Sequence, residues 1–342
     1  MKHRVVVLQH GSHGTHRDLG CLARLLRALD PPPVVVEPQV NEGFQTDDGV
    51  VVCGARLVQE VLRALSSLCM KALVPSTAPA ATSAMPGVER ETTVQLSFVA
   101  HSMGGLIVRE ALPQLVRELR CQEGNLRVEW KVFCSIATPH AGTRHMDASV
   151  RSYLGRLLGR LYSTAYHDMF LQSSVLTERL ISTEHLASLA AFEHRLLISS
   201  MNDLIVPLMS SGFMLKPSQR GEMSPVVRVE KEAAMCAVSE EEMCAKRHSI
   251  AELPAEEWPQ DQYPVERHIA EAMLKGAGAF DSIVVDFTQL HKQCDNPRVR
   301  HSAEQLSHRA LVCKQPIPQM GLEDIFCFVS RWVAGELAAW HR

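Results

Sequence analysis

The stretch QLSFVAHSMGGLIVRE, residues 95–110, holds a serine at the point where strand-like sequence changes to helix-like sequence. Residues 95–100 are apolar and β-prone, two glycines follow closely after Ser102, and LIVREAL then takes up helical spacing. An x-S-x-G pattern between a strand and a helix is the context that a nucleophile elbow requires. Ser102 is therefore a candidate nucleophile, with an ordinary residue at a strand–helix junction as the alternative.

Ser102 needs chemical partners, because a serine hydroxyl is a poor nucleophile at neutral pH. Acyl transfer requires an imidazole to take its proton, a carboxylate to orient the imidazole, and N–H groups that bind the oxyanion. The loop QHGSHG, residues 9–14, follows the first predicted strand, where hydrolases of this architecture place one such donor. We predict the backbone N–H groups of Ser12 and Met103 as the two donors, since Met103 also opens a helix with a positive end.

The acid and the base are sought later in the chain. Asp203 follows the predicted strand RLLISS, at the edge where open α/β sheets place functional loops. It is the candidate acid, although a simple turn residue would also fit. Three histidines follow the last predicted strand: His291, His301 and His308. The order Ser, Asp, His fits an α/β-hydrolase, but the residues alone leave the choice among the three open.

The elements that must position these residues alternate along the chain. Apolar runs predict strands at residues 4–9, 34–40, 95–100, 130–136, 195–200 and 283–287. Amphipathic spacing predicts helices at residues 18–29, 50–68 and 103–119, and a last helix that includes Ile325, Val329 and Leu337. Short apolar strands that alternate with helices predict an α/β fold, with a mostly parallel sheet and helices on both faces.

We expect one domain over residues 1–342, with two longer segments inside it. Residues 144–192 contain LGRLLGRLY and HLASLAAF, and they are predicted to form a cap or lid over the carboxyl edge of the sheet. Residues 214–278 are polar and predict a mobile or helical insertion with no catalytic part. Apolar residues of the expected cap favour a hydrophobic substrate, although the same residues also suit a core: Leu157, Leu158, Leu161 and Phe170.

Composition excludes several classes of protein. The formal net charge is −3, which gives no overall field that would attract nucleic acid. The ten cysteines form no C-x-x-C pair, which favours reduced thiols and a cytoplasmic location. No segment has the pattern of a signal peptide or a transmembrane helix, so peripheral membrane contact is the membrane role left open, and no protein partner is predicted.

Histidines near the N-terminus raise the question of a metal site. His10, His13 and His16 recur at helix-like spacing, but Gly11 and Gly14 place them in a loop. The chain has no H-E-x-x-H motif and neither of the common phosphate-binding glycine motifs. We therefore expect no metal and no cofactor.

Five motifs taken together resemble the putative serine esterase group of lipase-like α/β-hydrolases: HGSHG, FVAHSMGGLIVRE, SIATPHAG, NDLIVP and SHRALV. The likeness extends over residues 5–210 and 283–335. It implies Ser102 as nucleophile, Asp203 as acid and His308 as base, with Ser12 and Met103 forming the oxyanion hole. It also implies that further residues line the site: His10, Gly11, His101 and His140.

One position departs from the pattern of that group. Ala100 stands two residues before the nucleophile, where glycine is usual. The elbow is crowded, and a methyl group is the smallest step away from glycine, so we expect Ala100 to be tolerated.

These observations predict a serine hydrolase that cleaves carboxylic esters of lipids or other hydrophobic acyl groups. A thioesterase or amidase is an alternative, because the same groups serve all three reactions. A catalytically weak binding or scaffold module is another, because a fold by itself does not establish activity.

Overall fold

The computed structural model describes residues 2–73, 92–121, 126–146, 163–201, 203–214, 245–253, 258, 263–287, 307–320 and 323–341. The described strands form one seven-stranded sheet in the order β2-β1-β3-β4-β5-β7-β6. All strands run parallel except β6, which pairs antiparallel with β7. The strands are β1 (Lys2–Gln9), β2 (Val34–Val36), β3 (Thr92–His101), β4 (Leu126–Ile136), β5 (His194–Ser200), β6 (Ala245–Ile250) and β7 (Phe280–Val285). The predicted fold class, a mostly parallel α/β sheet, is confirmed.

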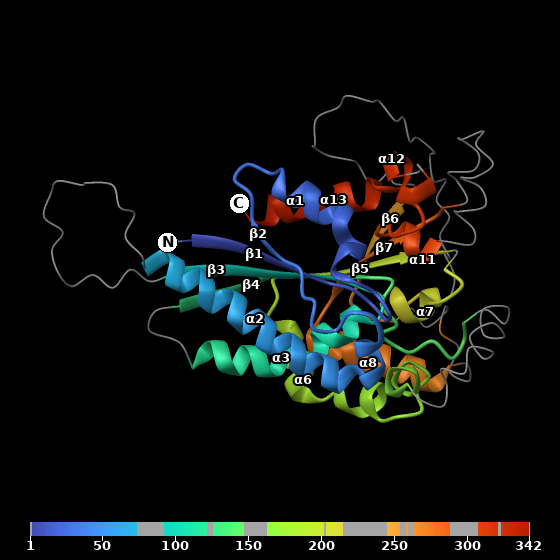
Figure 1. Ribbon diagram of the computed structural model, residues 1–342. Coiled ribbons are helices and arrows are strands. Elements are labelled where there is room, and N and C mark those ends of the chain that lie inside the picture. The colour runs from blue at the N-terminus through green and yellow to red at the C-terminus, as the bar shows by residue number, and fades with distance from the viewer. Residues whose placement is uncertain are drawn as a thin grey trace, which may run out of the picture.

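Helices cover both faces of the sheet (Figure 1). One layer contains α2 (Val50–Leu73), α3 (Gly104–Arg120), α6 (Thr183–Ala190) and α8 (Pro264–Ala277), and the other contains α1 (Gly20–Arg27) and α13 (Phe328–Trp340). Successive side chains of β1 alternate between the two cores: Val5 and Val7 pack in the first, Val6 and Leu8 in the second. Burial on both faces explains why the central strands are continuous apolar runs.

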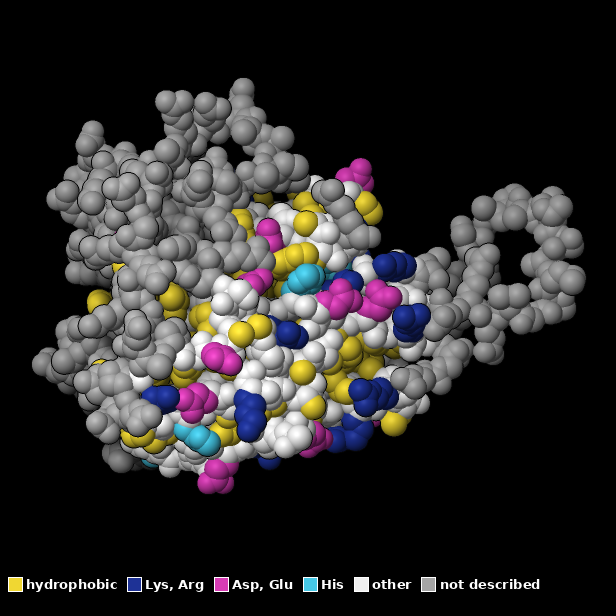
Figure 2. Space-filling view, turned by 180° about the vertical axis from the view of Figure 1, so that it is seen from behind, with side chains coloured by type: hydrophobic (Ala, Val, Ile, Leu, Met, Phe, Trp, Pro, Cys, Tyr) yellow, Lys and Arg dark blue, Asp and Glu magenta, His cyan; other side chains and the backbone are white. Residues whose placement is uncertain are grey.

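Short helices occupy the connections between these larger elements. They are η1 (His16–Leu19), η2 (Gly43–Asp48), α5 (Thr164–Met169), η4 (Val175–Arg179), α7 (Leu208–Ser211), α11 (Ser307–Ala310), η5 (Pro318–Met320) and α12 (Glu323–Phe326). Within the described part of the chain, none of the helices combines the length and the apolar character that crossing a bilayer requires. Figure 2 shows one face of the molecule, on which acidic, basic and apolar side chains of the described residues are interspersed.

Residues 214–278, expected to be a polar insertion, contribute two elements to the fold. The strand β6 pairs along β7 from Ala245 to Ile250, and α8 buries Ile269 and Met273 in the core of its layer. The apolar residues of α8 recur one helical turn apart, which explains how a segment with many charges still packs on the sheet. Residues 215–244 lie outside the described residues.

Residues 144–192, the expected cap, are described only in part. Leu157, Leu158 and Leu161 lie outside the described residues. Phe170 is 7% exposed and stacks on Tyr166, with 4.1 Å between ring centroids, so this residue is a core residue. The helix α6 lies beside α3 and α8 in the helical layer. Movement of this segment as a lid stays a prediction.

The carboxyl ends of the parallel strands meet at one edge of the sheet. Backbone hydrogen bonds between neighbouring strands continue just past the strand ends. The N–H of Ser102 donates to the carbonyl oxygen of Ile136 at 2.8 Å, and the N–H of Ala137 donates to that of Ile198 at 2.7 Å. The loops that follow β1, β3, β4 and β5 therefore leave the same edge in register. This is the edge where open α/β sheets hold their ligands.

The first turn of α3 approaches the end of β1 closely. A Cβ atom added at Gly104 would lie 2.5 Å from the backbone oxygen of His10 and 2.6 Å from that of Gln9. A Cβ atom at Gly105 would meet the side chain of Thr138. Because the atoms facing Gly104 belong to the backbone, they cannot move aside as a flexible side chain does.

We predict that Gly104→Ala lowers the free energy of unfolding by about 1–3 kcal/mol, because the added methyl group must push β1 and α3 apart. Urea denaturation followed by circular dichroism measures this. The matched control is Gly335→Ala in α13, where an added Cβ meets no described atom within 4 Å. There, alanine should stabilise the helix by about 0.5–1 kcal/mol. Equal stability of the two variants would contradict the close approach of α3 to β1.

Candidate active site

Ser102 lies on a sharp bend between β3 and α3. Its φ angle is +55°, in the left-handed region that residues other than glycine rarely adopt. The neighbouring loop after β1 has a glycine at the point where it faces this bend. A Cβ atom at Gly11 would lie only 2.6 Å from the Cβ of Ser102. The strand–serine–helix context predicted from the sequence is therefore present, and the bend is strained in the way that exposes a nucleophile.

The imidazole of His308 lies between Ser102 and Asp203. Its Nε2 is 3.0 Å from Ser102 Oγ, and its Nδ1 is 2.7 Å from Asp203 Oδ2. Since a carboxylate only accepts, Nδ1 carries the proton and donates to Asp203, which leaves Nε2 to accept the serine proton. The structure thus brings together the three residues predicted as nucleophile, acid and base from segments more than 100 residues apart in the chain.

Asp203 is held firmly by its own loop. Its side chain has 0% exposure, and Oδ1 accepts hydrogen bonds from the backbone N–H groups of Ile205 at 2.8 Å and Val206 at 3.0 Å. These donors offset the cost of burying a carboxylate and fix its orientation toward His308. Asp203 is therefore both a turn residue and the hydrogen-bond partner of His308. The two interpretations of this residue from the sequence, as a turn residue and as the candidate acid, are compatible.

The two predicted oxyanion donors lie on either side of this bend. Met103 is the N-cap of α3, where backbone N–H groups have no partner within the helix and the helix dipole is positive. Ser12 follows Gly11, the residue that packs against Ser102. Donation from these N–H groups to an oxyanion stays a prediction, because that oxygen exists only during a reaction.

The buried ring of His101 contacts His308. Its Nε2 donates to the backbone oxygen of His308 at 2.9 Å, and the two ring centroids are 4.7 Å apart. The ring is 2% exposed, and this burial lowers the pKa of His101 well below the usual histidine value, with the neighbouring His308 lowering it further. A neutral His101 can therefore hold His308 without placing a second positive charge beside it.

The remaining site-lining predictions have different surroundings. His10 is fully buried, its Nδ1 donates to the oxygen of Gly11 at 3.0 Å, and burial lowers the pKa of its ring. The ring of His140 contacts Arg109 at 3.2 Å and the hydroxyl of Ser135 at 2.8 Å. His140 thus belongs to a buried polar network under the carboxyl edge, and its polar contacts do not include Ser102.

An ion pair that no sequence signal indicated joins the two loops of the site. Lys314, six residues after His308, pairs with Asp18, and their side chains are only 19% and 10% exposed. A Cβ atom at Gly14 would lie 2.5 Å from the Asp18 carboxylate, so this pair reaches the loop that contains Ser12. A partly buried pair is screened less than a surface pair.

The three N-terminal histidines do not share a ligand position. His10 bonds to Gly11, His13 pairs with Asp47, and His16 pairs with Glu42. Among the described residues, no group of three or more histidine, cysteine, aspartate or glutamate side chains has the geometry of a metal site. His291 and His301, the other candidates for the base, lie outside the described residues.

A family model described as putative serine esterase (DUF676) matches residues 1–216. The matched range includes Ser102 and Asp203 and ends before His308. No curated protein gives a significant match to the sequence.

The solved structures to which parts of this chain are similar include three bacterial and fungal proteins. Phospholipase PlaB from Legionella pneumophila is 14% identical, with a TM-score of 0.40, and the match covers 62% of this chain and 44% of that one. A lipase-esterase related protein from Clostridium acetobutylicum is 12% identical, with a TM-score of 0.34 and coverage of 61% and 79%. Aspergillus fumigatus lipase B is 15% identical, with a TM-score of 0.36 and coverage of 61% and 40%. The chain thus spans less than half the length of two of these proteins.

The contact of His101 with the backbone of His308 predicts a graded effect of substitution. His101→Phe keeps a ring but loses the donor and leaves the His308 carbonyl without it, so we expect kcat for an ester substrate to fall about tenfold. His101→Gln, whose amide nitrogen can reach the same carbonyl, should retain most of the wild-type rate. Steady-state kinetics of both variants measure the difference. Equal rates would show that the hydrogen bond does not position the base.

Proposed function

This chain belongs to the putative serine esterase family and has an α/β-hydrolase fold, and on that basis we propose that it hydrolyses carboxylic esters through an acyl-enzyme on Ser102. One observation carries the proposal. His308 contacts Ser102 Oγ through Nε2 at 3.0 Å and Asp203 through Nδ1 at 2.7 Å, which is the geometry of a nucleophile, a base and an orienting acid.

Each residue has a defined part in the proposed reaction. Ser102 Oγ attacks the carbonyl carbon while His308 Nε2 takes the hydroxyl proton, and the carbonyl oxygen becomes an oxyanion held by the N–H groups of Ser12 and Met103. The bond to the leaving alcohol then breaks, and His308 gives its proton to that alcohol. Water attacks the acyl-enzyme by the same route and releases the acid. Asp203 stabilises the imidazolium at each stage.

We further propose that the acyl group is hydrophobic, as in a lipid ester. The support is Phe44, which is 81% exposed at the start of η2. Its ring packs edge-on against His13, with 5.2 Å between centroids, and His13 is the residue next to Ser12. An uncovered aromatic ring this close to the proposed oxyanion loop offers apolar surface to an acyl chain.

A cytoplasmic location is part of the proposal. Its support is the state of the cysteines, since Cys21, Cys53 and Cys134 are free and buried. Buried free thiols behave as small apolar side chains, and they are typical of a reducing compartment.

The central test of the proposed function is labelling of the purified protein with a fluorophosphonate. We expect the wild-type protein to be labelled and Ser102→Ala to remain unlabelled, while His308→Ala loses on the order of 10³-fold or more in esterase turnover. Ser188→Ala is the control, because this hydroxyl bonds to Glu184 within α6 and should not affect labelling. A folded wild-type protein that never reacts would instead favour a binding module.

The preference for hydrophobic acyl groups is tested with p-nitrophenyl esters from acetate to laurate. We expect kcat/KM to rise with chain length, and Phe44→Gln to lower the laurate value about tenfold with little change for acetate, because only a long chain reaches this ring. Val52→Gln, at another exposed apolar residue, is the control and should match the wild type. The same loss for acetate and laurate would place Phe44 outside the acyl path.

A further inference from the structure

The loop that contains Ser12 folds into a tight turn under strain. The N–H of Gly14 donates to the oxygen of Gly11 at 3.1 Å, so Ser12 and His13 are the two central residues of the turn. His13 has a φ angle of +50°. At the third position of a turn, a residue with a positive φ angle is ordinarily glycine. A histidine in this conformation persists only where surrounding contacts hold it.

The short helix η2 supplies such contacts to the backbone of the turn. The N–H of His13 donates to Thr46 Oγ1 at 2.9 Å, and the Thr46 hydroxyl donates to the oxygen of Gly43 at 2.8 Å. The N–H of Gly43 then donates to the oxygen of Gly14 at 2.9 Å. Thr46 has 0% exposure, so this arrangement lies where a lost hydrogen bond is not replaced by water.

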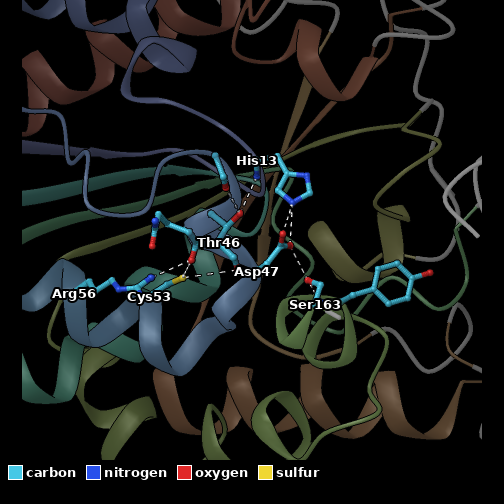
Figure 3. A network of polar contacts seen from close by, with 9 residues as sticks. His13, Thr46, Asp47, Cys53, Arg56 and Ser163 are labelled. Carbon is cyan, nitrogen blue, oxygen red and sulfur yellow. Dashed lines mark hydrogen bonds and ion pairs between the residues drawn. The ribbon is translucent and has the colours of Figure 1, made fainter. Parts of the chain in front are cut away.

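A second set of contacts holds the side chain of His13 (Figure 3). Its Nε2 is 2.9 Å and 3.0 Å from the two oxygens of Asp47, and the hydroxyl of Ser163 donates to the same carboxylate at 2.8 Å from the other side. Ser163 is the N-cap of α5, so Asp47 connects the turn to that helix. The side chain of His13 is 54% exposed and that of Asp47 28%, so this pair is screened by water and holds the turn less strongly than Thr46 does.

We propose that Thr46, and to a smaller extent Asp47, are positioning residues that place the Ser12 N–H for the oxyanion. The inference rests on the proposed esterase function and names the part of the fold that keeps its oxyanion loop in place. Neither residue touches the reacting atoms. Their effect reaches the site because Gly11, at the start of the same turn, packs against Ser102, so relaxation of the turn moves Ser12 relative to the nucleophile.

The experiment compares Thr46→Val with Thr46→Ser. Valine keeps the shape of the side chain and removes both hydrogen bonds of the hydroxyl, whereas serine keeps the hydroxyl. Each protein is first titrated to completion with a fluorophosphonate, which gives its fraction of active sites. For the active fraction, kcat and KM are measured with one ester, and affinity is measured for a trifluoromethyl ketone, which forms a tetrahedral oxyanion adduct with a serine nucleophile.

Loss of an oxyanion donor costs about 10²–10³-fold in kcat, and a misplaced donor should cost part of this. For Thr46→Val we expect kcat to fall about tenfold or more, KM to stay within about twofold, and ketone affinity to fall by about the same factor as kcat, because only the oxyanion state uses this donor. Thr46→Ser should restore both quantities. A residue with only a structural role would change the active fraction and leave the kinetics of the active sites unchanged.

Thr143→Val is the matched control. Thr143 is 3% exposed and its hydroxyl donates to the oxygen of Met169 at 3.3 Å, so this variant also loses a buried threonine hydrogen bond. Its melting temperature should fall while its kcat and ketone affinity match the wild type. If Thr46→Val does not fold, Asp47→Ala gives the same test with Thr46 in place, with an expected loss of about threefold in kcat and in ketone affinity.

The outcomes separate the two proposals. Wild-type kcat and ketone affinity in the active fraction of Thr46→Val would overturn the positioning role while leaving the esterase function intact. A rise in KM with unchanged kcat would also overturn it, because that pattern indicates substrate binding in the ground state. A wild-type protein that neither reacts with the fluorophosphonate nor turns over an ester would refute the esterase proposal itself.

Discussion

The close approach of three chain segments around Ser102 is the constraint on which the rest of the site depends. The bend at φ +55° needs a neighbouring residue with almost no side chain, which Gly11 provides, and Gly104 lets the first turn of α3 approach the end of β1. Because β1 and β3 are adjacent parallel strands, the loop after β1 is already beside the bend. Packing at one edge of the sheet thus places Ser102 and the turn that contains Ser12 side by side.

The charges around His308 follow from burial. The ring of His101 lies beside that of His308, and His10 is buried nearby; burial lowers the pKa of both His10 and His101, so neither adds a positive charge beside His308. The nearby Lys314 is paired with Asp18. Asp203, fixed by backbone donors of its own loop, is then the carboxylate in direct contact with the imidazole. The contact with Asp203 therefore orients the ring of His308, and the buried imidazole of His101 adds no charge beside it.

The sequence predicted the parts of the fold that depend on local pattern. Strands buried on both faces are apolar runs, so six strands and the bend at Ser102 could be located from the sequence. The strand β6 could not, because an antiparallel edge strand within a polar segment is defined by its pairing with β7. His308 was selected among three histidines by family resemblance, since only the fold brings residues 206 positions apart into contact. Thr46 and Asp18 carry no sequence signal, because their roles come from contacts with the loop after β1.

Ala100 stands where glycine is usual in the related group, and the structure explains how this residue is accommodated. Ala100 is fully buried on β3, with its methyl group in the core cluster that also contains residues of α2 and α3. The crowding at the bend falls instead on Gly11 and Gly104, where an added Cβ would meet neighbouring atoms at 2.5–2.6 Å. A methyl group at position 100 therefore fills core space without displacing Ser102, which has a φ angle of +55° and a 3.0 Å contact with His308. The departure from glycine is then a packing variation, and it gives no physical reason to expect weak catalysis.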